Sequence, residues 1–244
     1  RPGRAIVVSA GNEGDKAIHV GRSLDEDEDA YTFSLVPREG SLDFSLWYPG
    51  GSSFTITVVP PGGAPISVPT GGSDSASTPS GNVYVDNAAG GENPENGDNE
   101  ALINLSGLTS QLPWSVTVTD SGGGGRFDGW ITSDNGTILG GDASETVDEP
   151  GNARRVITVG AFTTKNRWAS RAGEEDFSAQ YPIGDLLYFS SRGPTRDGRV
   201  KPEITAPGAW IAAAMSSSAP AADYLTCPDG VHTLLLGTSM AAPH

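Results

Sequence analysis

The chain has 244 residues, a formal net charge of −15 at pH 7 and a hydrophobic content of 36%. This content supports a folded core and argues against wholesale disorder. The acidity argues against nucleic acid or an anionic membrane as a partner, because phosphate groups would repel the chain. The single cysteine, Cys227, excludes an internal disulfide and a cysteine-based metal cage. No stretch reaches the ~18 consecutive apolar residues of a membrane span.

Three short apolar runs predict buried strands. The first is Ala5–Ala10, which is closed by Gly-Asn-Glu-Gly; the second is Arg155–Ala161, and the third is Ala209–Ala214. Continuous apolar runs of this length are typical of parallel strands that are covered on both faces. We therefore expect all three runs in one sheet of an α/β domain.

Residues 17–139 follow a different pattern. Apolar and polar residues alternate with period two in short runs that turn residues bound, and no helical period intervenes. The runs are Tyr31–Val36, Leu42–Tyr48, Phe54–Val59, Val83–Val85, Ala101–Leu105, Trp114–Thr119 and Phe127–Ile131. About seven or eight such strands predict an antiparallel β-sandwich or jelly roll. The expected fold is thus α/β, with a partial parallel sheet in residues 1–16 and 140–244 and a sandwich inserted as residues 17–139.

Two motifs carry a family resemblance. The sequences VVSAGNEG at Val7–Gly14 and GTSMAAPH at Gly237–His244 resemble the subtilisin-like serine proteases (subtilases). Between them, Val156–Ala161, Phe189–Pro194 and Lys201–Gly208 occur in the order of that family. A lone Gly-Thr-Ser would be a weak signal, but ordered motifs are specific. The resemblance covers about half of the chain and omits the insertion, which is similar in position to the jelly-roll insertion of clostridial germination-associated subtilases.

The resemblance implies a part of a serine endopeptidase that hydrolyses peptide bonds through an acyl-enzyme. Ser239 would be the nucleophile, and the Asn12 side-chain amide would stabilise the oxyanion. The substrate-binding residues implied are Ser9, Ala10, Gly11 and Glu13, with Thr238 helping to position the oxyanion. A serine at a helix start lies beside free backbone N–H groups, and Asn12 follows a parallel strand, where α/β folds place their sites. Taken singly, Ser239 would suit a helix N-cap and Asn12 a turn.

The rest of the family's catalytic triad is expected to be missing. The family has an aspartate in an Asp-Ser/Thr-Gly context and a histidine in His-Gly-Thr-His, both upstream of the asparagine motif, and we expect neither in this chain. His244 would lie about 140° around the helix axis from Ser239. His19 and His232 are expected to be surface or loop residues. Since serine without a base is a poor nucleophile, we expect a chain that is inactive alone.

Two accounts of this absence remain: a piece of a longer enzyme, which the sequence favours, or a degenerate protease. The alternative function is accordingly a non-catalytic protein- or glycan-binding protein on a degenerate protease scaffold. The expected partners are a protein or peptide substrate and a protein partner of the insertion, with no nucleic acid and no membrane span. The expected location is secreted or at the cell surface.

Two acidic segments invite a calcium interpretation, because clustered oxygen ligands in loops suit that ion. They are Asp25–Asp29 and Glu92–Glu100. In the second, an EF-hand register with Gly97 at the sixth position puts Pro94 where a ligand is needed, so that motif fails. Solvated loops are the favoured interpretation. Calcium remains the one candidate cofactor, and no metal-binding residue is assigned.

Overall fold

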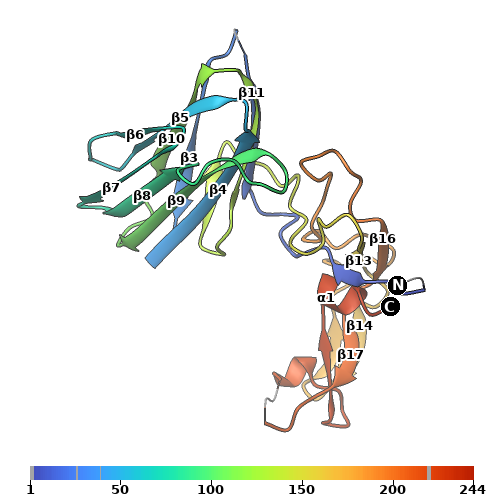
Figure 1. Ribbon diagram of the computed structural model, residues 1–244. Helices are drawn as coiled ribbons and strands as arrows, with labels where there is room; N and C mark the ends of the chain where they lie inside the picture. Colours follow the sequence, from blue (N-terminus) through green and yellow to red (C-terminus); the bar gives the residue numbers. More distant parts are fainter. Residues whose placement is uncertain (1–2, 26, 39, 219–220) are drawn as a thin grey trace. The chain divides into compact units, whose positions relative to one another are not determined.

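The computed structural model describes residues 3–25, 27–38, 40–218 and 221–244. The chain forms two compact units (Figure 1). One consists of the residues up to Lys16 together with Ala143–His244, and the other is Ala17–Asp142. Each unit has a buried hydrophobic core of its own. No helix in the described ranges is long and apolar enough to cross a membrane.

The first unit contains a three-stranded parallel sheet in the order β1-β13-β16. These strands are Val7–Ser9, Ile157–Phe162 and Ile204–Pro207. Val7 lies opposite Ile157, and Val159 lies opposite Ile204. The central strand β13 is buried almost throughout, which explains its continuous apolar run. The parallel sheet that the sequence predicts is therefore confirmed.

The third predicted strand was wrongly assigned. The run Ala209–Ala214 does not join the parallel sheet, because β16, four residues earlier, occupies that place. Its residues Ile211–Ala214 form β17, which pairs with β18 (His232–Leu235) in an antiparallel hairpin. The chain changes direction between the two strands at Trp210, whose φ of 54° lies in the left-handed region.

The remaining elements of this unit are short. β14 (Arg167–Ser170) and β15 (Gly173–Asp176) form a second hairpin, η1 spans Asp223–Leu225, and α1 spans Thr238–Ala241. Trp168, Phe177 and Trp210 pack together, with ring centroids 4.5–5.3 Å apart. In the part of the chain that the structure describes, α1 is the only α-helix. The α/β expectation is thus confirmed for the sheet, while the helical share is small.

The second unit is an antiparallel sandwich, as the sequence predicts. One sheet has five strands in the order β12-β3-β10-β5-β6, and the other has six in the order β2-β11-β4-β9-β8-β7. Strands that contain the expected runs are β3 (Ala30–Pro37), β4 (Gly40–Pro49), β5 (Ser53–Val59), β8 (Gly81–Asn87), β9 (Asp98–Leu108), β10 (Trp114–Gly122) and β11 (Gly125–Ile131). Unexpected strands are β2 (His19–Leu24), β6 (Ile66–Pro69), β7 (Gly72–Thr78) and β12 (Gly136–Leu139).

The alternation of apolar and polar residues explains which strands of this unit the sequence predicts and which strands it misses. On β5, Phe54, Ile56 and Val58 are fully buried, because alternate side chains of a strand point to the same face. Strand β7 lies at the edge of its sheet and consists mainly of serine, glycine and threonine, so it shows no apolar alternation. Strand β7 belongs to the sheet because it forms backbone hydrogen bonds with β8, and not because of its apolar pattern.

The two ends of the sandwich segment meet. The His19 amide donates a hydrogen bond to the Asp142 carbonyl oxygen (3.2 Å), and the Asp142 amide donates one to the His19 carbonyl oxygen (2.8 Å). The chain therefore enters and leaves this unit at adjacent positions.

Candidate active site

The two family motifs meet at the carboxyl end of the parallel sheet. Asn12 follows β1, and Gly208 follows β16. The Gly237 amide donates a hydrogen bond to the Gly208 carbonyl oxygen (2.9 Å), which holds the start of α1 at this edge. The carboxyl ends of parallel strands are where α/β folds bind ligands. Residues more than 200 positions apart in the sequence thus share one site.

Thr238 joins the two motifs. It has no exposed surface. Its amide donates a hydrogen bond to Asn12 Oδ1 (3.0 Å), and its hydroxyl accepts one from the Gly11 amide (3.2 Å). The hydroxyl proton has two acceptors within reach, the Gly11 carbonyl oxygen (3.1 Å) and Asn12 Oδ1 (3.2 Å). Because Oδ1 is held by Thr238, Asn12 Nδ2 is left as a donor, and none of the described residues accepts from it.

Ser239 is exposed at the start of α1. The amides of Met240 and Ala241 both donate to the Gly237 carbonyl oxygen (3.1 and 3.2 Å). Within the described ranges, neither the Ser239 hydroxyl nor its amide has a hydrogen-bond partner. Three polar groups around Thr238 are therefore available to a ligand: the Ser239 hydroxyl, the Ser239 amide and Asn12 Nδ2.

Two glycines permit this geometry. Gly237 has a φ of 152°, and a Cβ there would lie 3.5 Å from Asn12 Oδ1. Gly11 has a φ of 104°, and a Cβ there would lie 2.7 Å from both Glu13 Oε2 and the Ser191 hydroxyl. A side chain at Gly11 would therefore displace the loop that carries Asn12.

The expected substrate-binding residues lie along the same loop. Ser9 is half-buried at the end of β1, whereas the Ala10 side chain is fully buried and its amide donates to the Val159 carbonyl oxygen (3.0 Å). The Glu13 side chain is 21% exposed, and its Oε1 lies 3.7 Å from Lys16 Nζ. Of the expected set, Ser9, Gly11 and Glu13 keep some exposed surface, while Ala10 and Thr238 are buried.

Ser191 supports this loop, and sequence reasoning assigned it no role. Its hydroxyl accepts a hydrogen bond from the Glu13 amide (3.0 Å) and donates one to Glu13 Oε2 (3.2 Å). Its own amide donates to the Gly11 carbonyl oxygen (3.1 Å). The paired serines before Arg-Gly-Pro were the available signal, but only the fold brings them to the asparagine loop.

The histidines of this chain are engaged elsewhere. His244 Nδ1 lies 2.9 Å from the Met240 carbonyl oxygen, and His232 Nδ1 lies 2.7 Å from Asp229 Oδ2. The expectation that His19 is a surface or loop residue was wrong, because it lies on β2 with 1% of its surface exposed. Its partners within the sandwich are Asp142 (Nδ1 to Oδ1, 2.9 Å) and Asp128 (Nε2 to Oδ1, 3.4 Å).

The expectation that no Asp-Ser-Gly occurs in this chain was also wrong. Asp120-Ser121-Gly122 has that sequence, at the end of β10, just before the turn to β11. Asp120 caps this turn by accepting hydrogen bonds from the amides of Gly122 (2.8 Å) and Gly124 (3.1 Å). The motif here follows the asparagine loop in the chain and has a local structural explanation.

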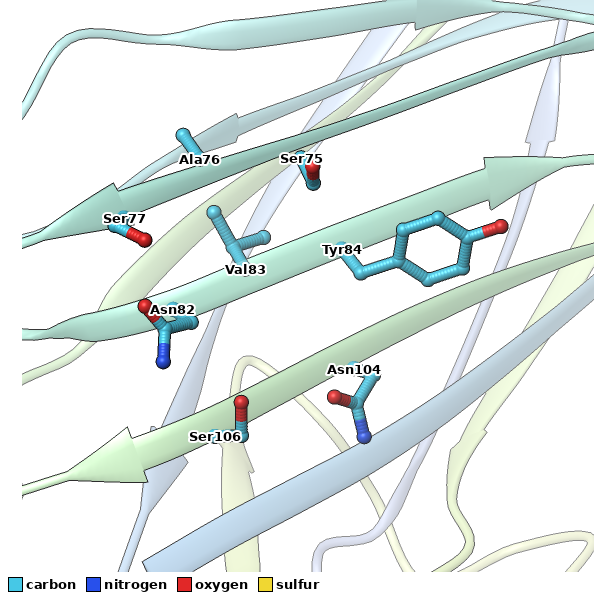
Figure 2. Close-up of a pocket in the computed structure, with 8 residues that line it drawn as sticks. All are labelled: Ser75, Ala76, Ser77, Asn82, Val83, Tyr84, Asn104 and Ser106. Atoms are coloured by element: carbon cyan, nitrogen blue, oxygen red, sulfur yellow. The ribbon is translucent and has the colours of Figure 1, made fainter.

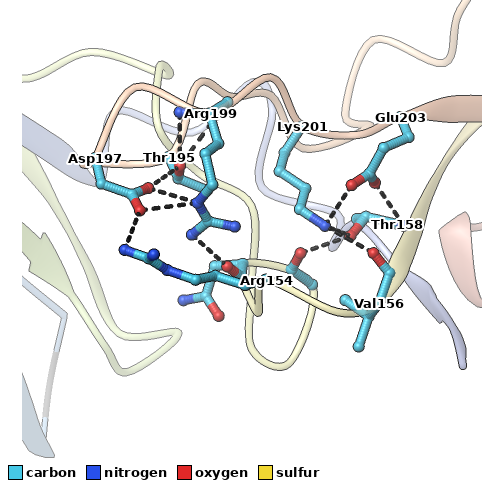
Figure 3. Close-up of polar contacts among 10 residues, drawn as sticks. Arg154, Val156, Thr158, Thr195, Asp197, Arg199, Lys201 and Glu203 are labelled. Atoms are coloured by element: carbon cyan, nitrogen blue, oxygen red, sulfur yellow. Dashed lines mark hydrogen bonds and ion pairs between the residues drawn. The ribbon is translucent and has the colours of Figure 1, made fainter. Parts of the chain in front are cut away.

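A buried lysine anchors the start of β13 (Figure 3). Lys201 Nζ donates to the Val156 carbonyl oxygen (3.0 Å) and to the Thr158 hydroxyl (3.0 Å), and lies 2.6 Å from Glu203 Oε1. Glu203 Oε2 also accepts from the Thr158 amide (2.8 Å). Burial by itself raises the pKa of Glu203, but these hydrogen bonds and the lysine charge outweigh it and lower the pKa. The Lys-Pro-Glu motif thus supports the central strand.

A second cluster of polar contacts in Figure 3 lies in the loop that precedes Lys201. Asp197 accepts hydrogen bonds from Arg199 (2.8 Å) and the Thr195 hydroxyl (2.5 Å), and Arg154 lies 3.2 Å away. Hydrogen bonds from Arg199 and Thr195 lower the pKa of Asp197 to about 2. Arg199 also donates to the Asn152 carbonyl oxygen (2.8 Å), which ties this loop to the segment before β13.

The acidic segments that suggested calcium contain turn-capping oxygens. Asp25 Oδ1 accepts from the amides of Asp27 (2.9 Å) and Glu28 (3.1 Å). Asn93 and Asn96 cap in the same way, accepting from the amides of Glu95 (2.9 Å) and Asp98 (3.0 Å). The solvated-loop interpretation stays a prediction, and Glu26 lies outside the described residues.

The chain belongs to the subtilase family, whose model matches residues 73–244. An uncharacterized protein of Aquifex aeolicus, aq_aa18, is 38% identical over 120 residues, which cover 46% of this chain and 51% of that protein. Serine protease AprX of Bacillus subtilis is 35% identical over 113 residues, which cover 42% of this chain and 21% of AprX. The structure of the CspB protease of Clostridium perfringens aligns with a TM-score of 0.71 at 23% identity.

The CspB alignment covers 98% of this chain and 46% of that chain. The two proteins therefore share a fold over almost the whole of this sequence, the sandwich included. This chain spans about half, or less, of the length of these relatives.

Proposed function

We propose that this chain carries the nucleophile and the oxyanion site of a serine endopeptidase, with Ser239 as the nucleophile. Membership of the subtilase family supports the reaction class, which is hydrolysis of peptide bonds in a protein or peptide substrate. The observation that carries the residue assignment is the bonding of Asn12 to Thr238, directly before an exposed serine. Attack by Ser239 Oγ on the carbonyl carbon would form a tetrahedral oxyanion while the base takes the hydroxyl proton. Collapse of the oxyanion would break the C–N bond, release the amine with that proton and leave an acyl-enzyme, which water then hydrolyses.

The oxyanion would accept two hydrogen bonds. One donor is Asn12 Nδ2, which is oriented because Thr238 holds Oδ1 of the same amide. The other donor is the Ser239 amide, which no described residue occupies. Donors fixed in advance stabilise developing charge without reorganisation when the reaction occurs. Ser9, Gly11 and Glu13 would line one side of the pocket for the substrate side chain that precedes the scissile bond. The buried Ala10 and Thr238 side chains would support these residues.

The general base and its aspartate would come from residues outside these 244. The support is that no histidine among the described residues contacts the Ser239 hydroxyl. A serine without a base reacts slowly, so the 244-residue chain alone would be inert. For the complete protein we propose a secreted or surface location by its resemblance to the family.

Labelling by a fluorophosphonate tests the assignment. The 244-residue chain is expected to remain unlabelled, whereas the protein encoded by the complete reading frame is expected to be labelled at Ser239 and to lose labelling in Ser239→Ala. In that protein Asn12→Ala should lower kcat by about 10²–10³, the magnitude measured in subtilisin for loss of an oxyanion donor. Asn96→Ala, at an exposed position of the sandwich, serves as the matched asparagine control.

The second candidate is a non-catalytic binding protein on a degenerate protease scaffold. The unpaired Ser239 hydroxyl favours it. A complete reading frame without a triad histidine and aspartate, combined with no labelling, would replace the endopeptidase proposal by this one.

A further inference from the structure

The sandwich carries a shallow hollow on the outer face of its six-stranded sheet. The hollow has a volume of about 280 Å³ and is lined from β7, β8 and β9 (Figure 2). Tyr84 and Asn82 project from β8, between Ser75 and Ser77 of β7 and Asn104 and Ser106 of β9.

Strand register brings these side chains together in two rows. Tyr84 lies opposite Ser75 on one side and Asn104 on the other. Asn82 lies opposite Ser77 and Ser106 in the same way. Residues opposite each other in an antiparallel pair project from the same face, about 5 Å apart. The face therefore presents one aromatic ring among amides and hydroxyls.

Most of these polar groups could form hydrogen bonds with a ligand. Among the residues that the structure describes, the Asn82 amide and the hydroxyls of Ser75, Ser77 and Ser106 have no hydrogen-bond partner. The Asn104 amide nitrogen donates to Asp43 Oδ1 (2.5 Å), which orients this amide and leaves its oxygen as an acceptor. Donors and acceptors thus surround the hollow together.

The Tyr84 side chain is held by a hydrogen bond but remains partly exposed to solvent. Its hydroxyl donates to Asp86 Oδ2 (3.3 Å), and 44% of the residue is exposed. An exposed ring beside oriented polar groups can stack on the C–H face of a sugar while the amides bond its hydroxyls.

Charge excludes anionic ligands. From Glu39 through Gly125 the sequence has no lysine, arginine or histidine and, with Glu39 included, nine acidic residues. Asp43 and Asp86 lie beside the hollow itself. A sulfated or uronic-acid glycan, a phosphate or a nucleic acid would meet repulsion here. A neutral carbohydrate would meet no such repulsion.

We propose that the outer face of β7, β8 and β9 binds a neutral polysaccharide, with Tyr84 stacking on a sugar ring and Asn82 and Asn104 bonding its hydroxyls. Such a surface would hold the protein on a glycan independently of the Ser239 site.

Sedimentation of the 244-residue chain with insoluble chitin and cellulose, and calorimetric titration with their soluble hexasaccharides, test this proposal. Saturable binding to at least one of the two is expected. Tyr84→Ala and Asn104→Ala should each weaken it about tenfold or more. Tyr224→Ala is the matched control, because Tyr224 is 43% exposed but lies in the other unit, and it should leave binding unchanged. Circular dichroism confirms folding of each variant.

Absence of binding to both glycans would overturn the proposal. Equal binding by wild type and Tyr84→Ala, or stronger binding of dextran sulfate than of the neutral hexasaccharides, would also overturn it. None of these outcomes depends on peptidase activity, so the failure of this proposal and that of the endopeptidase proposal are distinguishable.

Discussion

At the scale of single residues, Thr238 forms the hydrogen bonds that join the two motifs of the candidate site. One buried hydroxyl satisfies the amide of Gly11 and reaches two acceptors, and the Thr238 amide holds Asn12. Buried polar groups are costly when they lose a partner, so this residue couples the stability of the loop to the orientation of the Asn12 amide.

We expect Thr238→Val to lower the free energy of unfolding by about 1–3 kcal/mol, because the variant keeps the shape but leaves the partly buried Gly11 amide without its acceptor. Urea denaturation followed by tryptophan fluorescence measures the change. Thr238→Ser, which keeps the hydroxyl, is the control and should retain most of the stability. Equal stability of the valine variant and wild type would show that the hydroxyl contributes nothing.

At the scale of elements, a charged cluster joins strands β2 and β11. Asp128 is buried on β11, with His19 of β2 at 3.4 Å and two nitrogens of Arg126 at 2.5 and 3.1 Å. Burial raises the pKa of Asp128, but hydrogen bonds and charges from His19 and Arg126 outweigh it, so that the pKa lies below its ordinary value of 3.8. The folded state therefore favours the ionised carboxylate.

This lowered pKa has a definite consequence for stability against pH. The contribution of Asp128 is present above about pH 4 and is lost as the pH falls through the folded pKa. We expect Asp128→Asn to cost about 1–3 kcal/mol at pH 7, since it removes the negative charge that the hydrogen bonds from His19 and Arg126 stabilise, and the difference from wild type to shrink as the pH falls below about 4. Urea unfolding at several pH values measures it. Asp27→Asn, at an exposed position, serves as the control, and a pH-independent difference for Asp128→Asn would contradict the assignment.

At the scale of the whole molecule, each unit contains its own core. One core includes the largest buried side chains of the sandwich, such as Trp114 and Phe44, and the other lies around Trp168 and Trp210. Near its start and at its end, the sandwich segment Ala17–Asp142 is joined by the hydrogen-bonded pair His19 and Asp142. We therefore propose that residues 17–142 are an inserted domain, because excising them breaks the chain only at adjacent points.

Residues 17–142 alone are expected to unfold in one cooperative transition in urea, with strand-type circular dichroism. Leu46→Asp, at a fully buried position, should abolish the transition, whereas Leu112→Asp, at a position 52% exposed, should preserve it. A segment without a cooperative transition would mean that this unit needs the rest of the chain to fold.

The sequence alone determined the local features of this protein. Alternation located the central strands of the sandwich, since a strand with one buried face must alternate. The ordered motifs pointed to the subtilase family, which the comparison confirmed. Local pattern could not find β7, which has no buried alternation, or decide that β16 and not Ala209–Ala214 completes the parallel sheet.

Only the tertiary structure decided which residues meet. The hydrogen bond from Thr238 to Asn12 spans 226 positions, and the Glu13–Ser191 pair spans 178. His19 is buried on β2, where its ring meets Asp128 of β11 and Asp142, which lies after β12. Propensity and periodicity report only on neighbours along the chain, whereas these contacts exist because the packing of whole sheets closes long loops.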